Sequence, residues 1–247
     1  MMSHTESIIE ALNAYGDPAK ADWWYRYMHH KIRFIGVGIP EIRKRLHEWH
    51  SALHKTPHYL QVADELLKQE IAEYKLAGIL LYQIYILRTE PFETILEHVD
   101  TLFRHRYIYD WNTCDWLCVR VLTPIIETGT KQAKNTIIQW SNEEYLWHAR
   151  ASLVPFAQCK TLMYQLDDLV EPMTRLIQRE ERFSKTAVGW LLREIYKLDP
   201  QRVYQFLESA REFLIPEVVH NALKYADTET RQAFKEKLKS MKNGPSE

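Results

Sequence analysis

The stretch IAEYKLAGILLYQIYI, from Ile71 to Ile86, decides the fold class. Its apolar residues recur at spacings of three and four, the pattern of a helix with a wide buried face. Only 7 of the 247 residues are glycine, well below the average usage of about 7%. The sequence therefore predicts an all-α protein. Helix-breaking residues divide it into helices of about two to five turns, at Gly36, Gly38, Pro40, Pro57, Pro91, Gly129, Pro200 and Pro216.

A weak internal repeat emerges when the helices are aligned on a small residue within an apolar face. Ala77 and Ala151 are 74 residues apart, and Ala151 and Ala187 are 36 apart, close to two periods and one period of a HEAT-like helix pair. Such pairs bury their apolar faces only by stacking into a superhelix with a concave binding surface. We therefore expect a HEAT-like helical repeat solenoid, with a non-repetitive helical bundle as the alternative.

The composition indicates one folded domain. Hydrophobic residues make up 46% of the chain, which is enough apolar surface for a sizeable core, and no linker-like segment divides it. We expect a single domain over residues 1–240 and a disordered tail over residues 241–247.

Several features favour a soluble protein of the cytoplasm. Residues 1–6 lack the basic start of a secretory signal, and the apolar stretch Ala77–Leu87 is too short to span a bilayer. The three cysteines are an odd and sparse set, which argues for a reducing compartment. They are Cys114, Cys118 and Cys159.

Charge alone does not indicate a nucleic-acid partner. The formal net charge is −1, whereas nucleic-acid binding domains are usually basic. Basic residues do cluster locally, as at Arg43–Arg45, although each such cluster by itself is best explained as a solvated helix face.

The segment Tyr107–Trp116 is the best candidate for chemistry. Trp111 and Asp115 are four residues apart, so they share a face if a helix begins by Trp111. The alternative is structural: with Asp110 or Asn112 as the N-cap, Asp115 would be a first-turn carboxylate that the helix dipole favours.

The chain resembles the AlkD-type alkylpurine DNA glycosylases, which have HEAT-like repeats and remove positively charged N-alkylated purines from DNA. The Trp111 and Asp115 spacing matches the family pattern of Trp, three residues, then catalytic Asp. Four further blocks resemble the family and follow its order along the chain, which makes the combination fairly specific. They are Tyr27-Met28, Phe34–Arg43, Trp147–Arg150 and Gly189–Glu194.

The resemblance implies a role for each matching residue. Asp115 would be the catalytic carboxylate, Trp111 and Trp190 would flank the lesion nucleotide, and Arg150 would grip a phosphate. Two weaker candidates for DNA binding are Tyr27 and Lys185. By spacing alone each tryptophan is as readily a core residue, and each arginine a solvated or ion-paired one.

The chemistry that the resemblance implies fits these residue types. A purine alkylated at N3 or N7 carries a positive charge and leaves as a neutral base, so no general acid is needed. An ionised carboxylate such as Asp115 would stabilise the positive charge that develops on the deoxyribose. The expected enzyme hydrolyses the N-glycosidic bond in duplex DNA, leaves an abasic site and does not cut the backbone.

No cofactor, metal, membrane or obligate protein partner is implied, and we expect a monomer. His47, His50, His54 and His58 lie close in sequence but lack a metal-binding motif, so solvated or partly packed histidines are favoured. The cysteines are best explained as small buried side chains. The alternative function is a non-catalytic binding module, either a relative that holds DNA without excising bases or a scaffold for a protein partner.

Overall fold

The protein is helical throughout the residues that its computed structural model describes, which are 2–53 and 57–242. These residues contain no β-strand, and the backbone forms one isolated parallel bridge, between Arg33 and Ile71. The predicted all-α fold is confirmed.

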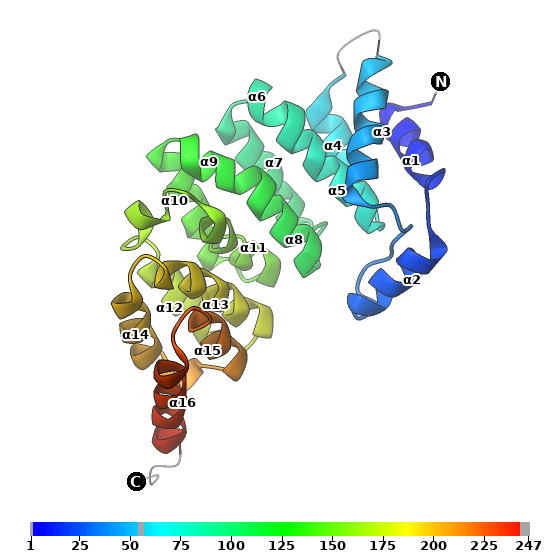
Figure 1. Cartoon of the computed structure of the whole chain (residues 1–247). Coiled ribbons are helices and arrows are strands. Elements are labelled where there is room, and N and C mark those ends of the chain that lie inside the picture. Colours follow the sequence, from blue (N-terminus) through cyan, green and yellow to red (C-terminus); the bar gives the residue numbers. More distant parts are fainter. Residues whose placement is uncertain (1, 54–56, 243–247) are drawn as a thin grey trace. The chain divides into compact units, whose positions relative to one another are not determined.

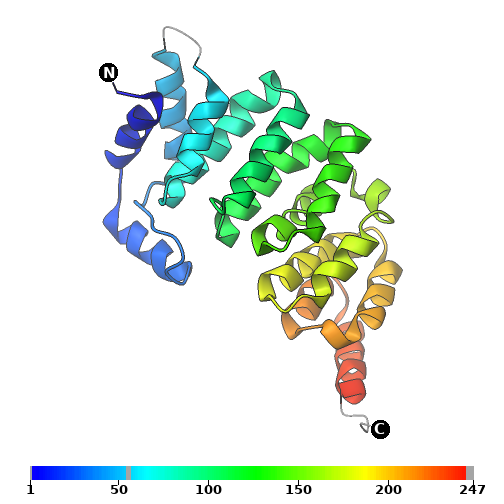
Figure 2. The ribbon, with the colours of Figure 1, turned by 180° about the vertical axis from the view of Figure 1, so that it is seen from behind.

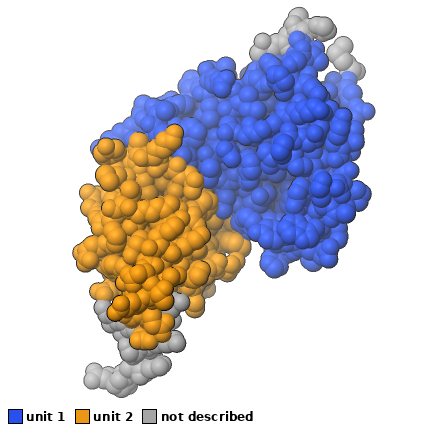
Figure 3. All heavy atoms as spheres, in the orientation of Figure 1, with its two compact units in different colours: residues 1–137 blue, residues 138–247 orange. Residues whose placement is uncertain are grey.

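The chain divides into two compact units, Met1–Ile137 and Ile138–Glu247 (Figure 3). The boundary falls inside one helix, α10 (Lys131–Gln139), and no linker marks it. The single domain over residues 1–240 stays a prediction. Of the predicted tail, residues 243–247 lie outside the described residues, and α16 runs to Lys242.

Helices α1 to α9 of unit 1 follow one another in chain order (Figure 1), and the colours trace the same order from behind (Figure 2). Two short π-helices, η1 and η2, interrupt longer helical stretches. The elements are α1 (His4–Asn13), α2 (Pro18–Tyr27), α3 (Ile39–Ser51), α4 (Tyr59–Leu67), α5 (Ala72–Leu81), η1 (Tyr82–Ile86), α6 (Leu87–Thr89), α7 (Phe92–Arg104), α8 (Trp111–Leu117), η2 (Cys118–Leu122) and α9 (Thr123–Thr128).

Helix α5 is the centre of unit 1. It packs against α3, α4 and α8, and all ten of its residues are buried. The sequence predicted one wide buried face for this stretch, but α5 is buried on all sides, and its polar residues Glu73 and Lys75 are buried as well. Gly78 permits the approach to α4, because a Cβ there would lie 2.7 Å from the carbonyl oxygen of Ala63.

Unit 2 is arranged around its longest apolar helix, α13, which packs against α11, α12, α14 and α15. Gly189 of α13 faces the backbone of Val218 on α15, where an added Cβ would lie 3.1 Å from Cα. The helical elements are η3 (Trp140–Asn142), α11 (Leu146–Arg150), η4 (Val154–Gln158), η5 (Leu162–Gln165), α12 (Val170–Gln178), α13 (Arg182–Tyr196), α14 (Pro200–Ser209), η6 (Arg211–Phe213), α15 (Pro216–Ala222) and α16 (Thr228–Lys242).

The sequence signals for helix boundaries agree with these bounds. Asp199 is the N-cap of α14 and accepts a hydrogen bond from the N–H of Arg202, with Pro200 at the first helical position. Gly129 ends α9. The three alanines on which the repeat was aligned, Ala77, Ala151 and Ala187, are fully buried.

Candidate functional site

Helix α8 presents Trp111 and Asp115 on one face. The helix begins at Trp111, and the Asp110 side chain caps it by accepting a hydrogen bond from the N–H of Thr113 at 2.9 Å. Asp115 is therefore the fifth helical residue, and the first turn of α8 contains no acidic residue. The explanation of Asp115 as a first-turn carboxylate is wrong, while the shared face of Trp111 and half-buried Asp115 is confirmed.

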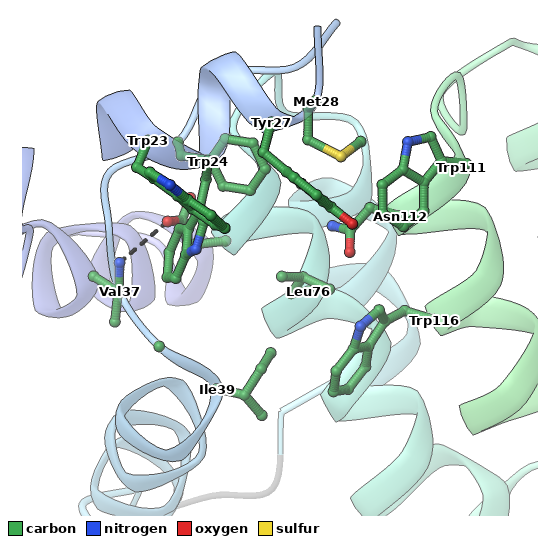
Figure 4. A pocket seen from close by; sticks show the side chains of 13 residues that line it. Trp23, Trp24, Tyr27, Met28, Val37, Ile39, Leu76, Trp111, Asn112 and Trp116 are labelled. Carbon is green, nitrogen blue, oxygen red and sulfur yellow. Dashed lines mark hydrogen bonds between the residues drawn. The ribbon is translucent and has the colours of Figure 1, made fainter. Parts of the chain in front are cut away.

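An aromatic groove lies beside the start of α8 (Figure 4). The rings of Tyr27 and Trp111 meet edge to face, 5.8 Å between centroids. Trp23 stacks on the other side of Tyr27 at 5.4 Å. More than half of the surface of Trp23 (57%) and Tyr27 (56%) is exposed. Exposure of two adjacent aromatic rings to water is unfavourable, and such exposed apolar surface often marks a site of contact with a ligand.

The groove has a volume of about 230 Å³ and is lined by residues of unit 1. Tryptophan is enriched around it, and three of its four tryptophans were not singled out from the sequence. The lining comprises Trp23, Trp24, Tyr27, Met28, Phe34, Val37, Gly38, Ile39, Glu73, Leu76, Trp111, Asn112 and Trp116. One available signal was the four-residue spacing of Trp23 and Tyr27 on α2, a helix without buried residues.

Glu73 holds the loop that places α2 at the groove. Its buried carboxylate accepts hydrogen bonds from the backbone N–H groups of Ile35, Gly36 and Val37, at 3.0, 2.7 and 3.1 Å. Burial raises the pKa of Glu73, and the three N–H groups oppose that shift. Gly36 has a φ of +87°, and a Cβ there would lie 2.0 Å from the carbonyl oxygen of Asp17.

Lys75 fixes the segment that leads into α8. Its fully buried ammonium donates hydrogen bonds to the carbonyl oxygens of Leu67 and Tyr107, the latter at 2.7 Å. The ammonium also lies 4.9 Å from the ring centroid of Tyr109. Burial lowers the pKa of Lys75 to about 8, and the carboxylate of Asp110 limits the shift. Lys75 thus ties α4 and α5 to the residues that precede Trp111.

The remaining predicted site residues lie in unit 2. Arg150 is 5% exposed, and its Nη1 donates to the carbonyl oxygen of Phe183 at 2.7 Å and to Oγ1 of Thr186 at 3.3 Å. Lys185 donates to the carbonyl oxygen of Phe213 at 2.6 Å. Trp190 is half-buried, three residues before Arg193, whose guanidinium carbon lies 5.8 Å from the Trp190 ring centroid.

The candidates are thus divided between the two units of the chain. Tyr27 and Trp111 line one groove in unit 1, with Asp115 one turn beyond Trp111. Arg150 contacts the first turn of α13, the helix that carries Lys185 and Trp190.

The described histidines of residues 47–58, for which the sequence predicts no metal site, are partly packed and partly solvated. His50 shares a 2.7 Å hydrogen bond with the hydroxyl of Tyr59, and its ring packs on Tyr85. His47 and His58 are exposed, and His54 lies outside the described residues. In the part of the chain that the structure describes, these histidines join no group of three possible metal ligands. All three cysteines are buried, as expected of small apolar side chains.

Among the described residues, no helix combines the length and the apolar character that crossing a bilayer requires.

Comparisons with known proteins cover nearly the whole chain. The model of a family described as DNA alkylation repair enzyme matches residues 8–236. A solved structure described as a predicted DNA alkylation repair enzyme from Enterococcus faecalis superposes with a TM-score of 0.72. It shares 21% sequence identity and covers 86% of this chain and 97% of its own. No curated protein matches.

Proposed function

Because this chain belongs to the DNA alkylation repair enzyme family, we propose that it is a DNA glycosylase for purines alkylated at N3 or N7. Family membership supports a role in alkylation repair with DNA as the substrate. The proposal adds the reaction: hydrolysis of the N-glycosidic bond of the damaged nucleotide in duplex DNA, leaving an abasic site and an intact backbone.

The substrate needs little activation. An alkyl group at N3 or N7 places a positive charge on the purine, which weakens the glycosidic bond and lets the base leave as a neutral molecule. Protonation of the leaving group is then unnecessary. What remains is the positive charge that grows on the deoxyribose as the bond breaks, and a nearby carboxylate stabilises that charge.

Asp115 is assigned this electrostatic role. The observation that carries the assignment is its position on α8, half-buried, one helical turn from Trp111, which lines the aromatic groove. The Asp110 cap and the Lys75 contacts fix the start of this helix. A preorganised carboxylate needs no rearrangement when the sugar becomes charged, which is the condition under which such groups contribute most.

The aromatic groove is assigned to the damaged nucleotide and its neighbours. Aromatic faces attract cations and pack on sugars. The rings of Trp111, Tyr27 and Trp23 lie one beside the next along the groove and offer such surfaces. For Trp190, on α13 of unit 2, we likewise propose an aromatic contact with the DNA.

Arg150 and Lys185 are assigned to phosphate groups. A guanidinium has five N–H donors in a planar fork that matches a phosphate. The bonds from Nη1 of Arg150 to Phe183 and Thr186 fix the direction of that fork. The Lys185 ammonium, bonded to Phe213, adds a second positive charge on α13.

The test is release of N7-methylguanine from a duplex, measured under single-turnover conditions for wild type and Asp115→Asn. The amide keeps the shape of the side chain but removes its charge, so we expect the rate to fall by about 100-fold or more. The matched control is Asp22→Asn, which neutralises an exposed carboxylate on α2 that pairs with Arg26 and should keep the wild-type rate.

Equal enzyme-dependent rates for wild type and Asp115→Asn would remove Asp115 from the mechanism. Binding of the duplex by wild type without any release above the spontaneous rate would instead favour the non-catalytic binding module.

A further inference from the structure

Two arginines of unit 1 lie next to the aromatic groove, near enough for their charges to interact. Arg43 lies on α3 and Arg120 on the π-helix η2, and the charge of Arg120 adds to burial in lowering the pKa of Arg43. Arg43 donates a 2.9 Å hydrogen bond to the side-chain oxygen of Gln83, on the π-helix η1. The guanidinium carbon of Arg120 lies 4.8 Å from the ring centroid of Trp116. Two contacting pairs of side chains, from four elements, thus lie near each other.

Neither arginine of this pair has a carboxylate partner among the described residues. Several other arginines of unit 1 do, namely Arg26, Arg33, Arg45 and Arg104. Arg45, two positions along α3, forms ion pairs with Glu41 at 2.8 Å and Glu48 at 2.7 Å. Two half-buried like charges with no anion repel each other, and most of their ten N–H donors lack a protein acceptor. An external anion would satisfy both the charges and the donors.

The backbone supports the same conclusion independently. Gln83 and Arg120 both project from π-helices, and η1 and η2 contact each other. Single-turn π-helices inside longer helices are uncommon and occur frequently at functional sites. Trp116 connects this cluster to the groove, because it lines the groove and also carries Arg120 on its ring.

We propose that Arg43, Gln83, Trp116 and Arg120 form a binding site for a phosphodiester group of DNA, next to the nucleotide in the aromatic groove. The two guanidiniums would each present a fork of donors to the phosphate, and Gln83 would hold Arg43 in position. This inference rests on the proposed function, since it assigns the anion to the DNA that carries the lesion.

The test is the salt dependence of binding to an undamaged fluorescent duplex, measured by anisotropy from about 50 to 200 mM salt. Each arginine that neutralises a phosphate contributes about one unit to the slope of log K against log salt. We expect Arg120→Gln and Arg43→Gln each to lower the slope by about one and to weaken binding several-fold. Arg104→Gln is the control, because it removes the same charge from an arginine paired with Asp100 on α7.

One further variant and one further measurement make the result specific. Arg120→Lys keeps the positive charge, so it should retain most of the salt slope if Arg120 binds a phosphate. If Arg120 acted only by packing on Trp116, Arg120→Lys would weaken binding as much as Arg120→Gln, and the phosphate site would be wrong. Thermal melting of each variant shows whether it is folded, and Arg120→Gln decides the question if Arg43→Gln does not fold.

An unchanged slope in Arg120→Gln, in a variant that still binds duplex, would overturn the phosphate site and leave the glycosylase proposal standing. Stabilisation of wild type by inorganic phosphate, lost in Arg120→Gln without any change in the duplex slope, would show a small-anion site and also overturn it. If the slope falls by about one in Arg120→Gln but the wild type releases no base, the phosphate site stands and the glycosylase proposal is contradicted.

Discussion

Lys75 is a charged residue enclosed by the most apolar helix of the protein, with its ammonium bonded to two carbonyl oxygens and close to Asp110. Burial disfavours its charged form, so its pKa is about 8 in the folded chain against an ordinary value of 10.5. Between these two values the unfolded chain binds a proton that the folded chain has released. The contribution of Lys75 to the free energy of unfolding therefore rises as the pH rises through this interval.

Chemical denaturation of wild type and Lys75→Met at pH 7.5 and pH 10 tests this linkage. Taken relative to the variant, wild type should gain roughly 2 kcal/mol in the free energy of unfolding at the higher pH. Other titrating groups, including the tyrosines, are common to both proteins and cancel in the difference. A difference that is constant between the two pH values, or that shrinks at pH 10, would show that the Lys75 pKa is not lowered.

Residue-scale expectations succeeded where a local pattern carries the information. The start of α8 and the shared face of Trp111 and Asp115 follow from four-residue spacing and a capping residue. The burial of Glu73 and Lys75 was not predicted, because their partners are backbone groups at Ile35–Val37 and Tyr107, remote in sequence. No local pattern records such a contact.

At the scale of elements, the loop between α2 and α3 positions the exposed rings of the groove. Its two glycines differ in what they permit. Gly36 has a left-handed backbone conformation, and a Cβ there would lie 2.0 Å from the carbonyl oxygen of Asp17. A Cβ on Gly38 would have the Pro40 ring as its nearest neighbour, at 3.8 Å. The two positions therefore make a matched pair.

Gly36→Ala should lower the free energy of unfolding by about 2 kcal/mol or more, because an alanine is strained at this φ and also collides with backbone. Gly38→Ala should stay within about 0.5 kcal/mol of wild type. The measurement is the thermal midpoint, with amide exchange of Ile35 and Val37 as a local readout of the bonds to Glu73. Equal stability of the two variants would mean that the loop does not depend on Gly36.

Some helix boundaries could be predicted, since Gly129, Asp199 and Pro216 end or begin helices as their chemistry requires. The π-helices η1 and η2 could not. Their residues, Tyr82–Ile86 and Cys118–Leu122, read as ordinary apolar helix, and a π-turn reflects the packing of neighbouring helices rather than local preference. The Gln83 and Arg120 cluster was missed for this reason.

At the scale of the whole molecule, helical periodicity was sufficient for the all-α fold, and the ordered motif blocks were sufficient for the family. The net charge of −1 does not indicate a nucleic-acid partner. Net charge sums over all surfaces, whereas a DNA contact depends on a few local cations, as in the site that we propose at Arg43 and Arg120. The groove could not be predicted from the sequence because Trp23 and Trp24 lie on α2, far along the chain from Trp111, and only the fold brings the two helices together.

The activity that we propose for this chain is breakage of glycosidic bonds, and not only binding of alkylated DNA. The direct measurement is the amount of N7-methylguanine liberated from a duplex by excess wild-type protein, against a protein-free sample that reports spontaneous loss, with strand integrity followed on the same samples. We expect release well above the spontaneous rate, with the strands intact until the abasic sites are cleaved chemically. Duplex that is bound but loses the base only at the spontaneous rate would contradict it.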